Sequence, residues 1–195
     1  MKKIILGLTG ASGGIYFLKL AETLRKYEIR LHVIASDNGA DVLKHETGVD
    51  IVEQVELWRG DSTAEVLPED DHDMFSAVAS GSYKCDAMVV IPCSMSTVAA
   101  IAAGVTDTLI RRAADVMIKE GRRLVVVPRE TPLSQIHLRN LYELSKCGVT
   151  VLPAMPAFYT KPETVSDMAD YITCKVLDSI GFENQNFPRW EGRSI

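Results

Sequence analysis

The sequence predicts an α/β protein in which a Rossmann-like (flavodoxin-type) parallel sheet carries helices on both faces. Short runs rich in valine and isoleucine alternate along the chain with longer segments of helical periodicity, and this alternation is typical of parallel sheets. The chain has 195 residues, of which 47% are hydrophobic and 24% charged, so a single domain with a sizeable core is expected. We expect this domain to span residues 1–183, and residues 184–195 to form a tail that docks on a neighbouring subunit.

The expected strands are uninterrupted apolar runs, which is the pattern of strands buried on both faces of a sheet. They cover residues 4–8, 31–35, 87–91, 124–127 and 149–152. Apolar residues at helical spacing predict helices over residues 15–24, 107–119, 133–146 and 164–180. Residues 55–82 show no regular period, and we expect a long loop there with about one turn of helix.

Composition excludes several classes of function. The formal net charge is −5 and the sequence pI is about 5.4, which opposes a broad surface for nucleic acid. The four cysteines form no CxxC pair and no zinc-ligand spacing, so we expect reduced thiols and a cytoplasmic protein. No apolar stretch approaches the roughly 18 residues of a membrane span. We therefore expect neither nucleic acid nor a membrane as a partner.

A glycine-rich segment, Thr9-Gly10-Ala11-Ser12-Gly13-Gly14, joins the first expected strand to the first expected helix. Residues without a Cβ let the backbone approach a phosphate, and a helix N-terminus adds free N–H groups and a positive dipole. We therefore expect this loop to bind a phosphate-bearing ligand, with the Ser12 hydroxyl contributing. The alternative is a tight turn in which Ser12 only caps the helix.

Polar residues also follow the other expected strands, at the edge of the sheet where α/β proteins bind ligands. Ser36 follows the second strand and suits a phosphate or a flavin edge, although a helix-capping role explains it equally well. Residues 92–97, Pro-Cys-Ser-Met-Ser-Thr, bring hydroxyl groups and a new helix N-terminus to the same crevice, with Cys93 interpreted as an inert small residue. Arg129 and Glu130 end a later strand, where an arginine can grip a phosphate and a glutamate can transfer a proton.

Two charged stretches have ordinary interpretations. Residues 70–73, Asp-Asp-His-Asp, offer possible metal ligands, but we interpret them as a solvated loop and expect no metal. Arg111, Arg112 and Lys119 have the spacing of a solvated basic helix face.

Four motifs together resemble the UbiX/Pad family of flavin prenyltransferases, formerly described as aromatic acid decarboxylases. They are T-G-A-S-G at 9–13, P-C-S-M-S-T at 92–97, R-A-A-D-V at 112–116 and V-P-R-E-T-P-L-S at 127–134. I-H-L-R-N at 136–140, P-A-F-Y at 156–159 and Pro188-Arg189-Trp190 extend the resemblance over nearly the whole chain. A collinear set of this kind is highly specific.

The resemblance implies an enzyme that transfers a dimethylallyl group from dimethylallyl phosphate to N5 and C6 of reduced FMN, without a metal. The product, prenylated FMN, would be delivered to a UbiD-type decarboxylase. The family also implies assembly into a homododecamer. FMN and the prenyl donor each carry a phosphate, which would explain two phosphate-binding devices around one crevice.

The site residues that the resemblance implies fall on the motifs above. FMN would contact Gly10, Ala11, Ser12, Ser36, Ser94, Met95, Ser96, Thr97 and Arg129. The prenyl phosphate would contact Arg112, Lys119, Arg129, Tyr159 and Lys175, and the implied catalytic residues are Ser12, Glu46, Lys119 and Glu130. Many members have lysine where this chain has Ser96, and a tryptophan that often lies near the isoprenoid falls in the region of Met74 and Phe75.

Two other functions fit parts of the sequence. One is an FMN-dependent cysteine decarboxylase of the phosphopantothenoylcysteine type, an oxidative lyase in which His45 would be the histidine. In that enzyme Arg129, Glu130, Tyr159 and Lys175 would have no purpose. The other is a non-catalytic subunit that carries FMN to a decarboxylase.

Overall fold

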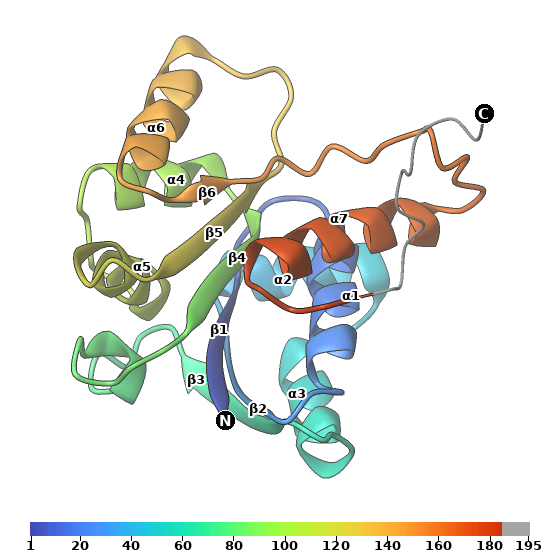
Figure 1. Ribbon diagram of the computed structural model, residues 1–195, viewed down its shortest axis with the longest axis horizontal. Coiled ribbons are helices and arrows are strands. Elements are labelled where there is room, and N and C mark those ends of the chain that lie inside the picture. Colours follow the sequence, from blue (N-terminus) through green and yellow to red (C-terminus); the bar gives the residue numbers. More distant parts are fainter. Residues whose placement is uncertain (185–195) are drawn as a thin grey trace.

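The computed structural model describes residues 1–184, in which six parallel strands form one sheet of order β3-β2-β1-β4-β5-β6 (Figure 1). The strands are β1 (Lys2–Leu8), β2 (Ile29–Ala35), β3 (Glu65–Asp70), β4 (Ala87–Cys93), β5 (Arg123–Pro128) and β6 (Thr150–Val151). Every neighbouring pair is parallel. The predicted Rossmann-like α/β class is confirmed. Except for its first residue, the expected tail lies outside the described residues.

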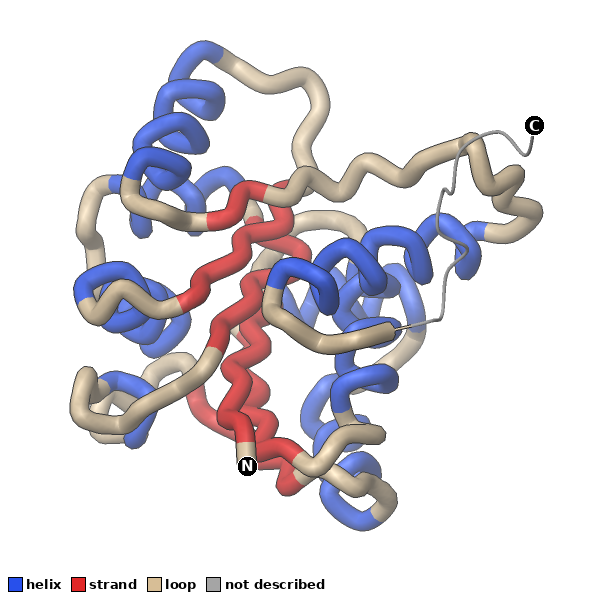
Figure 2. Tube along the Cα trace, viewed as in Figure 1, coloured by secondary structure: helices blue, strands red, loops and turns tan. Residues whose placement is uncertain are grey.

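Helices cover both faces of the sheet (Figures 1 and 2). On one face lie α1 (Gly14–Leu24), α2 (Asp37–Thr47), α3 (Ile51–Gly60) and α7 (Val165–Ser179). On the other lie α4 (Met95–Ala102), α5 (Leu109–Lys119) and α6 (Gln135–Lys146), with a short 3₁₀ helix, η1 (Ala77–Ala79). In the described part of the chain, no helix is both long and apolar enough to cross a membrane.

Each face of the sheet has its own apolar core, because successive side chains of a strand point to opposite faces. On β1, Ile4 and Leu6 pack with residues of α1 and α7, whereas Ile5 packs with residues of α5. All seven residues of β4 are buried, as expected for a central strand covered on both faces. Burying each large aliphatic side chain stabilises the fold by about 1.5–3 kcal/mol relative to exposure.

The expectation of a long loop over residues 55–82 is wrong. This stretch contains most of α3, all of β3 and η1. β3 is an edge strand whose residues alternate between more and less buried positions, so it has no continuous apolar run. It also contains Pro68, which an edge strand tolerates because one side of its backbone makes no ladder hydrogen bonds.

The strand order creates a crevice between β1 and β4, since the chain leaves these neighbouring strands toward opposite sides of the sheet. Thr9, buried just beyond β1, holds the two strand ends together. Its Oγ1 donates to the Pro92 carbonyl at 2.9 Å and accepts from the Ser94 N–H at 2.8 Å. The loops that follow both strands therefore have fixed starting points at the crevice.

Candidate functional site

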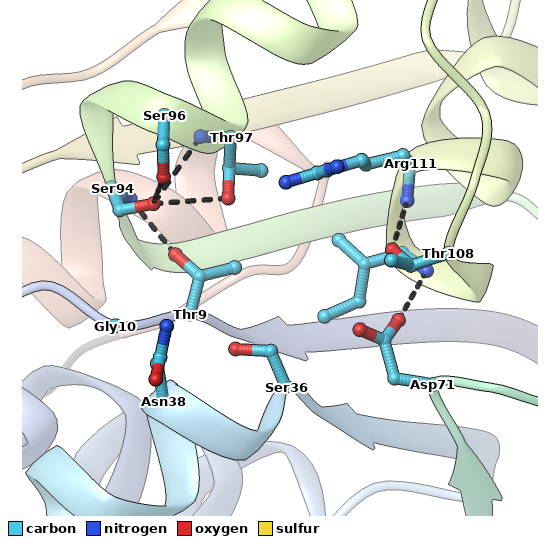
Figure 3. Close-up of a pocket in the computed structure, with 11 residues that line it drawn as sticks. Thr9, Gly10, Ser36, Asn38, Asp71, Ser94, Ser96, Thr97, Thr108 and Arg111 are labelled. Atoms are coloured by element: carbon cyan, nitrogen blue, oxygen red, sulfur yellow. Dashed lines mark hydrogen bonds between the residues drawn. The ribbon is translucent and has the colours of Figure 1, made fainter.

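A polar cavity of about 120 Å³ lies at the carboxyl ends of β1, β2, β3 and β4 (Figure 3). Its lining combines hydroxyl groups, an amide and one guanidinium from five separate segments of the chain. The lining residues are Thr9, Gly10, Ser36, Asn38, Asp71, Ser94, Ser96, Thr97, Thr108, Ile110 and Arg111. Five of the residues implied as FMN contacts are in this set, and we call the cavity the crevice.

Three helices begin at the crevice, and the N-cap residue of each lines it. Ser36 accepts from the Gly39 N–H of α2 at 3.1 Å, and Ser94 accepts from the Thr97 N–H of α4 at 3.3 Å. Thr108 caps α5 in the same way. The positive ends of three helix dipoles therefore meet at one place, which favours an anion there.

Arg111 adds a full positive charge to the crevice. It lies in the first turn of α5, and Figure 3 shows its side chain extending toward Thr97. Its Nη1 also donates to Asp107 Oδ1 at 2.6 Å, which anchors the guanidinium at the rim. The interpretation of Arg111 as part of a solvated basic face is wrong, because it lines the crevice.

The acidic stretch after β3 is not uniformly solvated either, because Asp71 is only 5% exposed. Its Oδ1 accepts from the Ile110 N–H at 2.8 Å, and its main-chain carbonyl accepts from the Leu109 N–H at 2.8 Å. Burial raises the pKa of the Asp71 carboxyl, although hydrogen bonds from Ile110 and Thr108 act in the opposite direction. Asp71 is thus a structural partner of α5.

The glycine-rich loop is held by a carboxylate on α2. Glu46 on α2 accepts from the N–H groups of Gly13 and Gly14, both at 2.9 Å, so the first donors of α1 are already taken by a carboxylate. The N-cap is Gly13 without a side-chain cap, so the capping alternative for Ser12 is wrong. Gly10 does line the crevice, and a Cβ there would lie 2.7 Å from Asn38 Cβ.

Burial alone would raise the pKa of Glu46, but hydrogen bonds from Ser12, Gly13 and Gly14 lower it below its usual value. A carboxylate at a helix N-terminus is stabilised by the helix dipole as well. In this structure Glu46 therefore holds the loop and α1 in place, whatever further role it has in a reaction.

Arg129 and Glu130 follow β5 at the same edge of the sheet. Arg129 Nε donates to the Ser12 carbonyl at 3.1 Å, which connects this strand end to the glycine-rich loop. Glu130 Oε1 accepts from the Thr131 N–H at 3.0 Å. Both residues line a second cavity of about 70 Å³ with apolar walls that include Leu133. Arg129 and Glu130 thus lie side by side along the chain on the wall of one cavity, and proton transfer by Glu130 stays a prediction.

Tyr159 and Lys175 lie further along the chain and near one another, around Tyr171. The Tyr159 and Tyr171 rings meet edge to face at 6.4 Å, and Lys175 Nζ lies 5.8 Å from the Tyr171 ring centroid. Lys175 lines an open groove of about 540 Å³ between α7 and the segment after β6. Neither residue lines the crevice.

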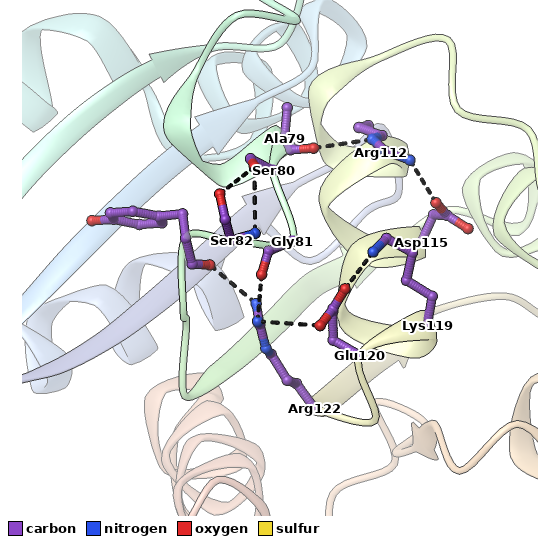
Figure 4. A network of polar contacts seen from close by, with 10 residues as sticks. Ala79, Ser80, Gly81, Ser82, Arg112, Asp115, Lys119, Glu120 and Arg122 are labelled. Carbon is purple, nitrogen blue, oxygen red and sulfur yellow. Dashed lines mark hydrogen bonds and ion pairs between the residues drawn. The ribbon is translucent and has the colours of Figure 1, made fainter.

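Lys119 and Arg112 form a separate group at the side of α5 (Figure 4). Lys119 Nζ pairs with Glu120, and Arg112 donates to the Ala79 carbonyl at 3.0 Å and to Asp115 at 2.8 Å. Because α5 rises about 1.5 Å per residue, its ten steps place Lys119 about 15 Å from the end of α5 that lines the crevice. One copy of the chain therefore does not bring the five implied phosphate contacts together.

Other implied residues have simpler outcomes. Ala11 and Met95 are buried and do not line the crevice. Cys93 is fully buried and burial raises its pKa to about 12, which agrees with an inert residue. Phe75 is completely exposed and Met74 is 40% exposed.

Within residues 1–184, no group of three or more His, Cys, Asp or Glu side chains is placed to hold a metal ion.

The sequence analysis missed four lining residues, Asn38, Asp71, Thr108 and Ile110, and misassigned Arg111. A signal for Thr108 was present, because a threonine directly before a helical run is a common N-cap. Asp71 gave no such signal, since its role depends on the unpredicted edge strand β3 that places it beside α5.

Comparison with known proteins identifies the family of this chain. A family model described as Flavoprotein matches residues 1–177. Flavin prenyltransferase LpdB of Lactiplantibacillus plantarum is 45% identical over 193 residues, covering 98% of this chain and 100% of the relative.

Two solved structures match over nearly their whole length. A dodecameric FMN-dependent UbiX-like decarboxylase from Escherichia coli O157:H7 has 42% identity and a TM-score of 0.89, covering 98% of this chain and 100% of that one. AnUbiX (PadA1), solved in complex with FMN and dimethylallyl pyrophosphate, has 39% identity and a TM-score of 0.91, with 99% of each chain covered.

Proposed function

This chain belongs to the Flavoprotein family, and from that premise we propose that it is a flavin prenyltransferase acting on reduced FMN and dimethylallyl phosphate. The observation that carries the proposal is the crevice, where three helix N-termini and Arg111 meet beside the Arg129–Glu130 pair. The full-length similarity to a named flavin prenyltransferase supports it. Prenylated FMN is the product, and a UbiD-type decarboxylase is its proposed recipient.

The donor groups of the crevice fit the phosphate and ribityl part of FMN. Hydroxyl groups and helix N-termini are the usual phosphate ligands of α/β proteins, and the one buried carboxylate, Asp71, is engaged by α5. When bound, reduced FMN supplies the electron-rich N5 and C6 positions that accept the prenyl group. The contacts to FMN that we propose are Gly10, Ala11, Ser12, Ser36, Ser94, Met95, Ser96, Thr97 and Arg129.

Glu130 is the proposed proton-transferring residue. It is a carboxyl group at a strand tip, adjacent to Arg129, on the wall of a cavity with apolar residues. Forming the bond at C6 requires loss of the proton that this carbon carries, and a carboxylate held beside a cation can accept it. Arg129, Lys175 and Tyr159 are proposed to stabilise the leaving phosphate. No divalent metal is required, because these cations neutralise a monophosphate.

Lys119 and Arg112 are proposed to act from a neighbouring copy of the chain. In one copy Lys119 lies about 15 Å along α5 from the crevice. Arg112 lies in the second turn of α5, but its guanidinium donates to Ala79 and Asp115 and does not line the crevice. We propose that both reach a donor phosphate across a subunit interface. The dodecameric relative supports assembly of this chain into a homododecamer. We also propose that residues 184–195 dock on a neighbour, and that the protein is cytoplasmic, which its four free cysteines support.

The test is direct turnover of the purified protein with chemically reduced FMN and dimethylallyl phosphate, under anaerobic conditions and with EDTA present. A flavin heavier by one five-carbon prenyl unit, detected by mass spectrometry, is the expected product. Release of carbon dioxide from phosphopantothenoylcysteine would instead indicate a cysteine decarboxylase. FMN binding with no turnover of either substrate would indicate a carrier subunit.

A further inference from the structure

Four helices, α1, α2, α4 and α5, begin at the crevice or at the glycine-rich loop beside it. They differ in which groups accept hydrogen bonds from the N–H groups at their N-termini. On α1 the N–H groups of the N-cap Gly13 and of Gly14 donate to Glu46, and on α5 the N–H groups of Leu109 and Ile110 donate to Asp71. Within residues 1–184, the N–H groups of the first two helical residues of α2 and of α4 donate to no protein acceptor. We therefore call the N-termini of α1 and α5 closed, because a carboxylate-bearing residue accepts their hydrogen bonds, and the N-termini of α2 and α4 open.

Asp71 closes α5 with two of its acceptor oxygens. The side chain takes the Ile110 N–H and the main-chain carbonyl takes the Leu109 N–H, each at 2.8 Å. The next N–H group, that of Arg111, donates to Thr108 Oγ1. α5 thus offers an anion no free main-chain donor in its first turn, and contributes the side chains of Thr108 and Arg111 instead.

The two contacts also fix the direction in which α5 enters the crevice. Asp71 is 5% exposed and directly follows Asp70, the last paired residue of β3, so the edge of the sheet anchors it. Because Arg111 lies one residue after Ile110, the same hydrogen bond places the main chain from which its guanidinium extends. A displacement of the first turn would move this positive charge away from the crevice.

We infer that Asp71 is a positioning residue for the phosphate of bound FMN: it closes the N-terminus of α5, directs the phosphate to the open N-termini of α2 and α4, and holds Thr108 and Arg111 against it. The inference rests on the proposed function. It assigns Asp71 no contact with the reacting atoms.

The electrostatic surroundings are compatible with this role. A carboxylate near a phosphate is unfavourable unless it is compensated, and Arg111 and His72 both act favourably on the Asp71 charge. Each of these two residues also contacts another carboxylate. Arg111 Nη1 donates to Asp107 Oδ1 at 2.6 Å, and His72 Nε2 lies 3.2 Å from Asp37 Oδ2.

The test compares binding of FMN with binding of riboflavin, which has the same ring system and ribityl chain but no phosphate. Dissociation constants are measured by flavin fluorescence for the wild-type protein, Asp71→Ala and Asp71→Asn. Asp70→Asn is the matched control, because Asp70 is the neighbouring carboxyl group, does not line the crevice and holds no residue of α5.

In Asp71→Ala we expect the preference for FMN over riboflavin to fall on the order of tenfold, with riboflavin affinity nearly unchanged. Asp71→Asn retains an oxygen that accepts the Ile110 N–H and should restore the preference, and Asp70→Asn should leave it unchanged. If Asp71 had a merely structural role, its replacement would weaken the binding of FMN and of riboflavin equally. If Asp71→Ala does not fold, Asp71→Ser, whose shorter side chain does not reach the amide, replaces it with the same expectation.

An unchanged preference in the folded Asp71→Ala or Asp71→Ser variant would overturn the inference. The inference would also be overturned if Asp71→Asn lost as much of the preference for FMN as Asp71→Ala does, because the asparagine retains the hydrogen-bond acceptor. Absence of FMN binding by the wild-type protein would contradict the proposed function itself.

Discussion

The two ends of α5 belong to two different parts of the molecule. At its N-terminus, Thr108 and Arg111 join residues from four other segments of the same chain in the crevice. At its C-terminus, Lys119 contacts Glu120 and the loop around Gly81, away from the crevice (Figure 4). This difference supports our proposal that the flavin-phosphate site is built within one chain, whereas the donor-phosphate site is shared between chains.

Flavin binding and prenyl transfer should therefore respond differently to substitution. The largest effect is expected for Glu130→Gln, which keeps the shape of the side chain but removes its ability to take a proton. Prenyl transfer should fall on the order of 10²–10⁴-fold. FMN affinity should not change, because Glu130 does not line the crevice.

The measurement is formation of prenylated FMN by mass and absorbance, with FMN affinity measured alongside. We expect a flavin alkylated at N5 but lacking the new ring to accumulate. Glu53→Gln, an exposed position on α3, is the control and should be active. Formation of the final product by Glu130→Gln at the wild-type rate would show that another group, such as the released phosphate, handles the proton.

Sharing of the donor site can be tested by mixing two inactive variants. Lys119→Ala alone should lose on the order of 100-fold in prenyl transfer, since one of the cations that stabilise the leaving phosphate is removed. When Lys119→Ala and Glu130→Gln are co-expressed, about a quarter of the interfaces combine an intact Lys119 with an intact Glu130. Activity should recover to about that fraction of wild type.

The control is to mix the two variants after separate purification under conditions that prevent subunit exchange, where no recovery is expected. If co-expression also gives no recovery while mixed assemblies are shown to form, Lys119 acts within its own chain or not at all.

A smaller effect is expected at the crevice itself for Gly10→Ala. The new Cβ would lie 2.7 Å from Asn38 Cβ, so the first turn of α2 must shift. Overpacking of this kind costs about 1–3 kcal/mol, and we expect FMN affinity to fall about tenfold. Gly60→Ala is the matched control, because nothing lies within 4 Å of its added Cβ. Isothermal titration with oxidised FMN measures the affinity of the wild-type protein and of the two variants. If Gly10→Ala binds FMN as tightly as the wild type does, Gly10 is not part of the binding site.

The smallest effect concerns the pH dependence of stability. The pKa of Glu46 is lowered in the folded protein, so its contribution is present above its usual value of about 4.5 and is lost as the pH falls through the folded pKa. Urea unfolding at pH 6 and pH 3.5 should therefore show a larger loss for the wild type than for Glu46→Gln. The difference should be small because the side chain is exposed to solvent. An identical loss in both proteins would exclude this linkage.

Much of the crevice could be predicted from the sequence because its residues follow buried strands. An uninterrupted apolar run such as residues 87–91 identifies a central strand, and the residues just after it must lie at the carboxyl edge. Ser36 and Ser94 were found in this way. β3 could not be found, since an edge strand that contains Pro68 and alternates in burial has neither a continuous run nor a reliable β pattern.

The relation between Lys119 and the crevice was also beyond sequence reasoning. A helix can be predicted from its periodicity, but which site its far end serves depends on the packing of whole subunits. The same applies to Glu46: helical spacing does not reveal that this carboxylate lies against the N–H groups of Gly13 and Gly14.

The edge strand β3 also limits how copies of this chain can associate. Exposed sheet edges are prone to extend from one molecule to the next, which leads to open-ended fibres. Here Pro68 removes one hydrogen-bond donor from the edge, and the exposed Asp70 places a carboxylate on it, while Glu65 and Glu69 are paired with Arg30 and His32. A second copy that approached this edge would bring the same proline and the same carboxylate on its own strand. Continuous sheet growth is thereby opposed on this side, and assembly is left to surfaces that can form a closed shell.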